Sequence, residues 1–322
     1  MRYVRLGKTD LEVSTIAFGT WAFGGEWGAF DEKDARDAIH HALDLGVTLF
    51  DTAQAYGFGR SERLLAETLR TSARRGDALI ATKGGLRRDG NDLVRDAGPG
   101  WLREGVEASL RNLGVEAIDL YQVHWPDPHT PADETAAALE DLVGEGKIRH
   151  VGVSNYDVKQ LDALATHGRV ETDQPPYDMF RRDIEAEILP YAADHDLGIL
   201  VYGPLAHGLL SGRMTADATF PADDWRSQSS DFTGETFRRN LRVVEKLRTF
   251  AEARSLSLPT LAVAWALSHP AVHVAIVGAQ RPADLEDTVA AAGVELSDAD
   301  RAEIDEILAD AAPVRGPSPE GM

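Results

Sequence analysis

Short apolar runs rich in β-branched residues alternate along nearly the whole chain with longer segments whose apolar residues recur every three or four positions. Runs of the first kind are typical of buried strands, and segments of the second kind are typical of amphipathic helices. The stripe of Ala35, Ala38, Ile39 and Ala42 is one example of the helical pattern. Eight strands are predicted, at residues 16–20, 48–51, 79–83, 118–124, 148–154, 170–174, 199–202 and 272–278.

Eight strands with helical crossovers predict an α/β protein of the (β/α)8 TIM-barrel class. An open doubly wound sheet would need a Gly-x-Gly-x-x-Gly turn after its first strand. Gly24, Gly25 and Gly28 do not have that spacing. No linker divides the chain, so we expect residues 1–312 to form a single barrel domain.

Three segments depart from the bare barrel pattern. Residues 2–13 predict a β-hairpin around Gly7–Asp10 that plugs the barrel floor. Residues 206–236 predict a long loop after the seventh strand, and loops of that length in compact domains are usually functional. Residues 313–322 are rich in proline and glycine, which predicts a disordered tail.

Composition and charge narrow the classes of partner. The net charge is −20, with 53 acidic residues against only six lysines. Such a surface repels nucleic acid and anionic membranes, so we expect neither as a partner. The acidic residues are dispersed over predicted helices, a pattern that resembles proteins from high-salt cytoplasm and suggests a halophilic source.

The chain shows no sign of export or of membrane insertion. The N-terminal residues include no apolar signal-peptide core, and no apolar run approaches the ~18 residues of a membrane helix. The absence of cysteine excludes thiol nucleophiles and disulfides. We therefore expect a cytoplasmic protein.

Polar residues at the carboxyl ends of the predicted strands carry the candidate chemistry, because barrel active sites lie at that end. Asp51 and Tyr56 follow the second strand, Lys83 ends the third, and His124 ends the fourth. Taken singly, Asp51 is also compatible with a helix cap, Tyr56 with a rim aromatic residue and His124 with a core histidine.

Lys83 is the hardest of the four to explain without a function. It ends an apolar strand, and burying its ammonium requires a carboxylate partner, for which Asp51 is the candidate. Beside an ammonium the pKa of the Tyr56 phenol falls, which makes it a better acid at neutral pH. A neutral His124 can hydrogen-bond a substrate carbonyl oxygen. The four residues together predict a proton-transfer site.

Four sequence segments resemble the aldo-keto reductase family. They are LFDTAQAYGFGRSE at 49–62, TKGG at 82–85, LYQVHWP at 120–126 and KIRHVGVSN at 147–155. The resemblance covers roughly residues 3 to 312. It implies that Asp51, Tyr56, Lys83 and His124 form a catalytic tetrad. It also implies hydride transfer between NAD(P)H and a small-molecule aldehyde or ketone, without a metal and with Tyr56 as proton donor.

The resemblance further implies a set of coenzyme contacts. Ser154, Asn155 and Gln174 are assigned to the nicotinamide carboxamide, Tyr202 to stacking against the ring, and GLLSGR at 208–213 to the pyrophosphate. The full set of expected contacts is Gly19, Thr20, Trp21, Ser154, Asn155, Gln174, Tyr202, Gly203, Pro204, Leu205, Gly208, Ser211, Arg213, Gly278, Ala279, Arg281, Asp284, Asp287 and Thr288.

The adenosine segment 276–288 departs from the usual family pattern at two places. Asp284 stands where Gln or Arg is common, and Asp287-Thr288 stands where Glu-Asn is common. Arg281 suits the 2′-phosphate of NADPH, whereas an acid beside the ribose suits the 2′-hydroxyl of NADH. We expect NADPH and leave NADH open.

Two questions remain open at this point: the walls of the substrate pocket and the rival functions. We expect an aromatic pocket built from Trp21, Trp27, Trp125, Trp225 and Phe232. One rival is a coenzyme-binding regulatory subunit of the same fold without significant turnover. Another is a metal-dependent hydrolase using Asp51, His124, His150 and Asp173, although the first strand lacks a His-x-His.

Overall fold

A closed barrel of eight parallel strands forms the centre of the computed structural model, which describes residues 1–25, 27–90, 92–221 and 224–319. All eight predicted strands are present, with ends shifted by no more than a few residues, and the predicted TIM barrel is confirmed. The strands are β3 (Ile16–Gly19), β4 (Leu49–Asp51), β5 (Leu79–Gly84), β8 (Ile118–Val123), β9 (Ile148–Ser154), β10 (Thr172–Gln174), β11 (Gly198–Tyr202) and β12 (Val274–Gly278).

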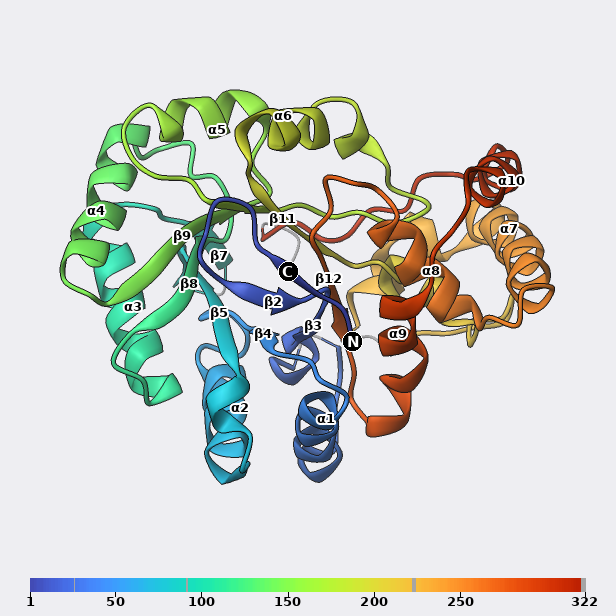
Figure 1. The fold of residues 1–322 in the computed structure, drawn as a ribbon, viewed down its shortest axis with the longest axis horizontal. Coiled ribbons are helices and arrows are strands. Elements are labelled where there is room, and N and C mark those ends of the chain that lie inside the picture. Colours follow the sequence, from blue (N-terminus) through green and yellow to red (C-terminus); the bar gives the residue numbers. More distant parts are fainter. Residues whose placement is uncertain (26, 91, 222–223, 320–322) are drawn as a thin grey trace.

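Helices surround the barrel on its outside (Figure 1). Sequence signals set their ends: Asp31 caps the first helix by accepting from the amides of Lys33 and Asp34, and Gly114 ends the third at a φ of 63°. The helices are α1 (Glu32–Asp44), α2 (Arg60–Thr71), α3 (Pro99–Leu113), α4 (Ala132–Gly144), α5 (Val158–Ala165), α6 (Ile188–His195), α7 (Gly234–Glu252), α8 (Leu258–Leu267), α9 (Glu286–Ala290) and α10 (Asp298–Leu308). Among the described residues, none of these helices combines the length and apolar character needed to cross a membrane.

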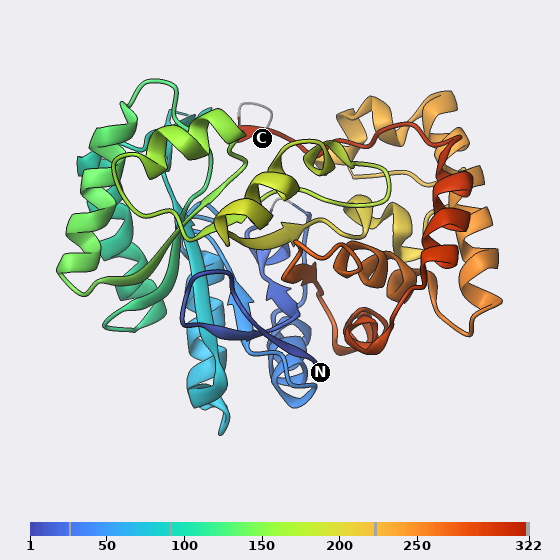
Figure 2. The same cartoon turned by 45° about the horizontal axis from the view of Figure 1, so that its top comes forward.

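The predicted N-terminal hairpin closes one end of the barrel. Strands β1 (Tyr3–Arg5) and β2 (Glu12–Ser14) pair antiparallel, and Leu6 and Val13 are fully buried in the cluster that fills the barrel interior. The turn is seated so tightly that a Cβ at Gly7, where φ is +52°, would overlap the backbone of Gly198. In Figure 2 the N-terminus lies at this closed end and the C-terminus at the opposite end.

His150 fastens this hairpin to the barrel. Its Nδ1 lies 2.9 Å from Glu171 Oε1 and its Nε2 lies 2.8 Å from Asp10 Oδ1 in the hairpin turn. The hydrogen bond with Glu171, only partly opposed by burial, raises the pKa of His150 above 6.5. The imidazolium form therefore stabilises the docked hairpin.

We expect His150→Gln to lower the unfolding temperature, and to do so most below pH 6.5. A histidine whose pKa is raised by folding contributes its full stabilisation below the unfolded value and loses it as pH rises through the folded value. Because Asp10 is exposed, the contribution should not exceed about 1 kcal/mol. Thermal unfolding from pH 5.5 to 8.5 measures it, with the exposed His167→Gln as control. A difference in unfolding temperature between parent and variant that is constant across this pH range would contradict the prediction.

Three segments outside the barrel differ from the sequence predictions. An antiparallel hairpin of β6 (Leu86–Asp89) and β7 (Asp92–Arg95) follows the third barrel strand and was not predicted. The long segment after β11, predicted as a loop over 206–236, contains 3-10 turns at Ala206–Ser211, Trp225–Gln228 and Ser230–Phe232, and its last residues already belong to α7.

The C-terminal segment, expected to be disordered, packs against the barrel as far as it is described. Val314 is fully buried and its amide donates to the carbonyl of Phe180 at 3.3 Å. The next amide, of Arg315, donates to Asp231 Oδ2 at 2.9 Å. Burial of the apolar Val314 side chain favours docking of this segment, which its content of proline and glycine did not indicate.

Candidate active site

The four predicted catalytic residues converge at the carboxyl end of the barrel. Parallel register places Asp51 of β4 beside Ala81 of β5, so Lys83, two residues further along β5, lies one side-chain repeat beyond it. Lys83 Nζ donates to Asp51 Oδ1 at 2.5 Å and to Tyr56 Oη at 3.4 Å. The Tyr56 and His124 rings meet edge to face, with their centroids 5.7 Å apart.

The side chains of Lys83 and Asp51 form a buried ion pair. The Lys83 side chain is 1% exposed and that of Asp51 is 4% exposed. Burial lowers the pKa of Lys83 below 10.5, and the adjacent Asp51 carboxylate opposes this effect. A third hydrogen bond, to the carbonyl of Thr52 at 3.0 Å, fixes the ammonium between the carboxylate and the phenol.

His124 is kept neutral. Burial, and then the charge of Lys83, lower its pKa well below 6.5. Its amide donates to the carbonyl of Gly84 at 2.9 Å, and its own carbonyl accepts from Asn155 Nδ2 at 3.1 Å. A neutral imidazole in this position can donate one hydrogen bond to a substrate oxygen without competing with Tyr56 as the acid.

Amide side chains fix the second oxygen of Asp51. Gln174 Nε2 donates to Asp51 Oδ2 at 2.8 Å, and Gln122 Nε2 lies 3.5 Å from the same atom. The sequence had assigned Gln174 only to the coenzyme and had not selected Gln122. Both face the barrel axis with Asp51, a relation that depends on register between β8, β10 and β4 and is not visible in the order of residues.

Asn155 adopts a left-handed conformation, with φ of 64°, at the end of β9. Tyr202 donates to Asn155 Oδ1 at 2.8 Å, and Asn155 Nδ2 also donates to Ser154 Oγ at 3.0 Å. Ser154 in turn donates to the carbonyl of Gln174 at 2.7 Å. These residues, expected at the nicotinamide, thus form a preorganised polar wall beside the catalytic residues.

One cavity of about 910 Å³ joins the catalytic residues to the predicted coenzyme segments. Apart from Thr20 and Arg281, it is lined by the whole predicted coenzyme set. These residues are Gly19, Trp21, Ser154, Asn155, Gln174, Tyr202, Gly203, Pro204, Leu205, Gly208, Ser211, Arg213, Gly278, Ala279, Asp284, Asp287 and Thr288. Gly203, Gly208 and Gly212 line the cavity with positive φ angles, a conformation that glycine adopts readily. The lining therefore fits an extended dinucleotide.

Two expected coenzyme residues lie outside the lining. Thr20 is fully buried, and its hydroxyl is engaged by the Asp51 carbonyl and by Ser61 Oγ, at 3.1 and 2.7 Å. Arg281 extends along the surface, where its Nη2 lies 3.1 Å from Asp284 Oδ1. Arg213 reaches the same oxygen at 2.6 Å, so one carboxylate links both arginines at the adenosine end.

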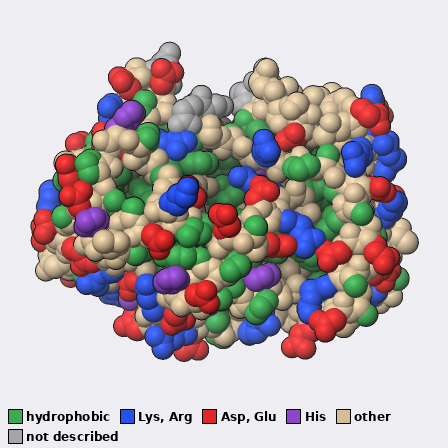
Figure 3. All heavy atoms as spheres, turned by 90° about the horizontal axis from the view of Figure 1, so that it is seen from above, with side chains coloured by type: hydrophobic (Ala, Val, Ile, Leu, Met, Phe, Trp, Pro, Cys, Tyr) green, Lys and Arg blue, Asp and Glu red, His purple; other side chains and the backbone are tan. Residues whose placement is uncertain are grey.

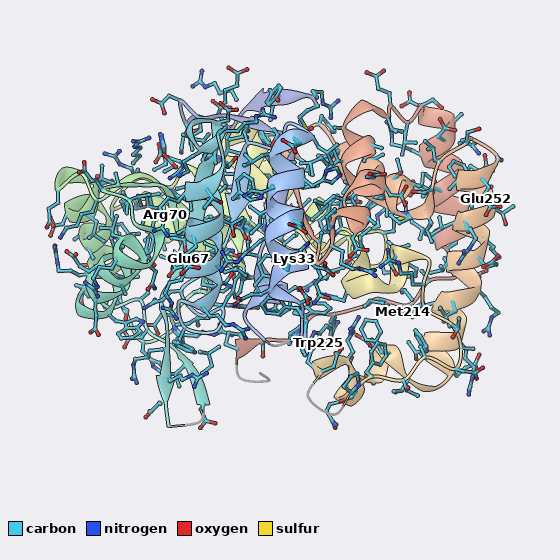
Figure 4. The ribbon with its side chains drawn as sticks, turned by 90° about the horizontal axis from the view of Figure 1, so that it is seen from below. Lys33, Glu67, Arg70, Met214, Trp225 and Glu252 are labelled. Atoms are coloured by element: carbon cyan, nitrogen blue, oxygen red, sulfur yellow. The ribbon has the colours of Figure 1, made fainter. Side chains whose placement is uncertain are left out.

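Only part of the expected substrate pocket faces the cavity. Trp21, Trp27 and Trp125 line it, but Trp225 and Phe232 do not, which corrects the prediction. Trp225 stands behind Trp27, with centroids 6.2 Å apart, and Phe232 is 2% exposed against it. Figure 4 labels Trp225 and Met214 in the segment between β11 and α7, and Glu252, which lines the cavity from the end of α7. Packing, rather than the presence of an aromatic ring, decides which residues face the cavity.

Several cavity residues were missed by sequence reasoning. Leu86, Arg88 and Leu93 enter from the β6–β7 hairpin, and Gly316 and Pro317 enter from the C-terminal segment. The Asp89-Gly90 pair, which is common in tight hairpin turns, was the local signal for the hairpin. The sequence offers no comparable signal for the contact made by the C-terminal segment.

The residues of the metal-hydrolase alternative do not meet. His150 lies at the hairpin end of the barrel with Asp10 and Glu171, whereas Asp51 and His124 lie at the opposite end. Asp173 precedes the inward-facing Gln174 and so points out of the barrel. In the described part of the chain, no three histidine or acidic side chains are placed to hold a metal ion.

This barrel, with its long cavity at the carboxyl ends of the strands, defines a class of nicotinamide-dependent oxidoreductase. The profile of the Aldo/keto reductase family matches residues 15–309, and the chain belongs to this family. Members of this class carry out NAD(P)H-dependent carbonyl reduction.

Similar proteins cover almost the whole chain. "Aldo-keto reductase YhdN" of Bacillus subtilis is 42% identical, over 96% of this chain and 94% of that protein. An "NADH-specific methylglyoxal reductase" of Escherichia coli is 34% identical, over 93% and 96%. The structure of the glycerol dehydrogenase AKR11B4 from Gluconobacter oxydans superposes with a TM-score of 0.89 at 40% identity, covering 98% of this chain and 97% of that one. A probable voltage-gated potassium channel subunit beta of Arabidopsis thaliana is 32% identical, over 91% and 92%.

Proposed function

We propose that this protein reduces a small aldehyde or ketone to the alcohol, reversibly, with Tyr56 donating the proton to the carbonyl oxygen. The observation that supports this most directly is the contact chain from Asp51 through the buried Lys83 to Tyr56, of 2.5 and 3.4 Å, at the wall of the cavity. It places the Lys83 ammonium, paired with Asp51, beside the only atom of the phenol that can lose a proton.

Each residue of the site has a separate task in this reaction. Lys83 stabilises the phenolate that remains after Tyr56 gives up its proton, and Asp51 keeps Lys83 charged and oriented. His124 donates to the carbonyl oxygen and fixes its direction, because it is neutral and cannot act as a competing acid at neutral pH. Trp21, stacked over Tyr56 with centroids 6.3 Å apart, shields the proton transfer from water.

The coenzyme supplies the hydride. Asn155, Ser154 and Tyr202 would hold the nicotinamide end through their preformed polar network, and the left-handed glycines would accommodate the pyrophosphate. No metal is required for this chemistry, since the carbonyl oxygen is polarised by hydrogen bonds from Tyr56 and His124.

We infer that NADPH is the preferred coenzyme and that NADH competes with it. Arg213 and Arg281 both contact Asp284 at the adenosine end, and their guanidinium groups suit a 2′-phosphate. Burial raises the pKa of Asp284, but the hydrogen bonds from the two arginines outweigh this, so the group is ionised. Its charge then favours the ribose hydroxyl of NADH.

Asp284→Asn should therefore raise the affinity for NADPH relative to NADH by about three- to tenfold. The change removes a carboxylate that repels the 2′-phosphate and releases both arginines to bind it. Fluorescence titration of both coenzymes measures the ratio of their Kd values, and the exposed neighbour Glu286→Gln serves as the control. An unchanged ratio, or one that moves toward NADH, would contradict this assignment of Asp284.

A dispersed acidic surface supports the further proposal of a halophilic, cytoplasmic protein. On the face in Figure 3, Asp and Glu side chains are scattered among Lys and Arg without forming a single acidic patch. With a net charge of −20, salt would relieve the self-repulsion of the folded chain. Assays are therefore needed in both low and high salt.

The proposed function is tested by coenzyme titration followed by turnover. NADPH and NADH are titrated by fluorescence, and a panel of carbonyl compounds that includes methylglyoxal and glyceraldehyde is then assayed. Coenzyme binding with turnover supports the proposal, and no binding in either salt condition overturns it. Binding without turnover across the panel would instead support a regulatory subunit, the alternative favoured by the similarity to a potassium channel subunit.

A further inference from the structure

The β6–β7 hairpin presents one of its faces to the substrate end of the cavity. Antiparallel register pairs Leu86 with Arg95 and Arg88 with Leu93, so these four side chains share a face. Leu86, Arg88 and Leu93 all line the cavity. Arg87 lies on the opposite face and pairs with Asp96 at 2.8 Å.

Arg88 stacks on an aromatic ring at the wall of the cavity. Its guanidinium carbon lies 4.4 Å from the centroid of the Phe58 ring. Phe58 also lines the cavity and follows the proposed proton donor Tyr56 by two residues. Stacking on this ring orients the planar guanidinium while leaving its N–H groups available.

Arg88 differs in its charge environment from the other arginines of the cavity. Arg213, Arg226 and Arg248 each lie within 3.2 Å of a carboxylate, of Asp284, Asp224 and Glu245 respectively. Arg88 has no such ion pair among the described residues, although the chain carries 53 acidic side chains. Asp92 also lines the cavity. It stands opposite Asp89 in the strand register of the hairpin, and it forms no ion pair with Arg88.

We propose that Arg88 is a specificity residue that binds a carboxylate carried by the carbonyl substrate. The inference rests on the proposed reductase function and narrows its substrate class to aldehydes or ketones bearing a carboxylate. The apolar part of such a substrate would lie between Leu86, Leu93 and Trp125, with its carbonyl at Tyr56 and its carboxylate at Arg88.

Two aldehydes of nearly equal size, one with a carboxylate and one without, test this assignment. These are 4-carboxybenzaldehyde and its neutral methyl ester, methyl 4-formylbenzoate. At low salt the parent should show kcat/KM about 5- to 50-fold higher for the acid, as expected for one charge-assisted hydrogen-bonded pair. The ratio should fall as salt rises.

Arg88→Gln should bring this ratio close to one, because it raises KM for the acid. We expect kcat for the acid and kcat/KM for the ester to change little. Arg88→Lys should recover part of the ratio, because it restores the charge without the planar fork. Arg87→Gln, on the opposite face of the same strand, should keep the parent ratio.

The outcomes separate this inference from the function on which it rests. Turnover of the ester without preference for the acid, or an Arg88→Gln variant with the parent ratio, overturns the role of Arg88 alone. Absence of turnover for every carbonyl compound with either coenzyme overturns the reductase function and this inference with it.

Discussion

Tyr56→Phe is expected to lower kcat/KM by roughly 10²–10⁴-fold while leaving coenzyme affinity largely unchanged. The variant keeps the ring that stacks on Trp21 and meets His124, and it removes only the hydroxyl that Lys83 contacts at 3.4 Å. Without that hydroxyl the carbonyl oxygen must take its proton from water. His124 does not replace it, because burial lowers the pKa of His124 well below 6.5.

Steady-state kinetics together with coenzyme titration measure this effect. Tyr191→Phe is the matched control, since Tyr191 lies on α6 and donates to Asp162 at 2.8 Å, away from the cavity. Parent-like activity in Tyr56→Phe would show that the proton comes from another group. A parallel loss of coenzyme binding would indicate that the substitution disturbs the pocket and not the proton transfer alone.

Asp173→Asn is expected to stabilise the protein, and to do so increasingly as pH rises. Asp173 is fully buried on β10, between Val153 and Ile199 of the neighbouring strands, and neither carboxylate oxygen has a hydrogen-bond partner among the described residues. Burial raises its pKa well above 3.8, and the nearby Gln174 amide only partly opposes this. The native state therefore retains a proton that the unfolded chain releases.

The sign of the pH dependence follows from proton linkage. Between the unfolded and the folded pKa values the native protein binds more protons, so its stability falls as pH rises. Asp173→Asn should abolish this fall in stability. Asp173→Leu should raise the free energy of unfolding by about 1–3 kcal/mol at every pH, because it removes the unpaired polar group. Denaturant unfolding from pH 4.5 to 8.5 measures both effects. The exposed Asp194→Asn is the control, and a parent-like pH profile in Asp173→Asn would refute the prediction.

The fold was predictable because its signals are local and repeated. Each barrel strand is a short apolar run, and helices such as α1 and α3 combine an apolar stripe with capping residues. By contrast, α8 (LPTLAVAWAL) is apolar on all sides and buried except at Pro259, so no periodicity marks it. The β6–β7 hairpin was missed because its exposed, charged strands lack the apolar alternation of a buried sheet.

The candidate active site was predictable only in part. Lys83 at the end of an apolar strand required a partner, and parallel register made Asp51 that partner, so the central ion pair followed from the sequence. The roles of Gln122 and Gln174 at Asp51 depend on which side chains of distant strands point to the barrel axis. The displacement of Trp225 and Phe232 from the cavity depends on aromatic packing within one loop segment.

The sequence by itself therefore determined the barrel, the family resemblance and the four residues of the proposed proton-transfer site, because strand periodicity and strand-end chemistry are properties of adjacent residues. The tertiary structure alone decided which residues line the substrate end of the cavity. It brought Arg88 onto the face of a hairpin beside Phe58, and it shared Asp284 between two arginines. The contacts of Arg88 with Phe58 and of Arg213 with Asp284 join segments far apart in the chain, and packing and loop geometry select them.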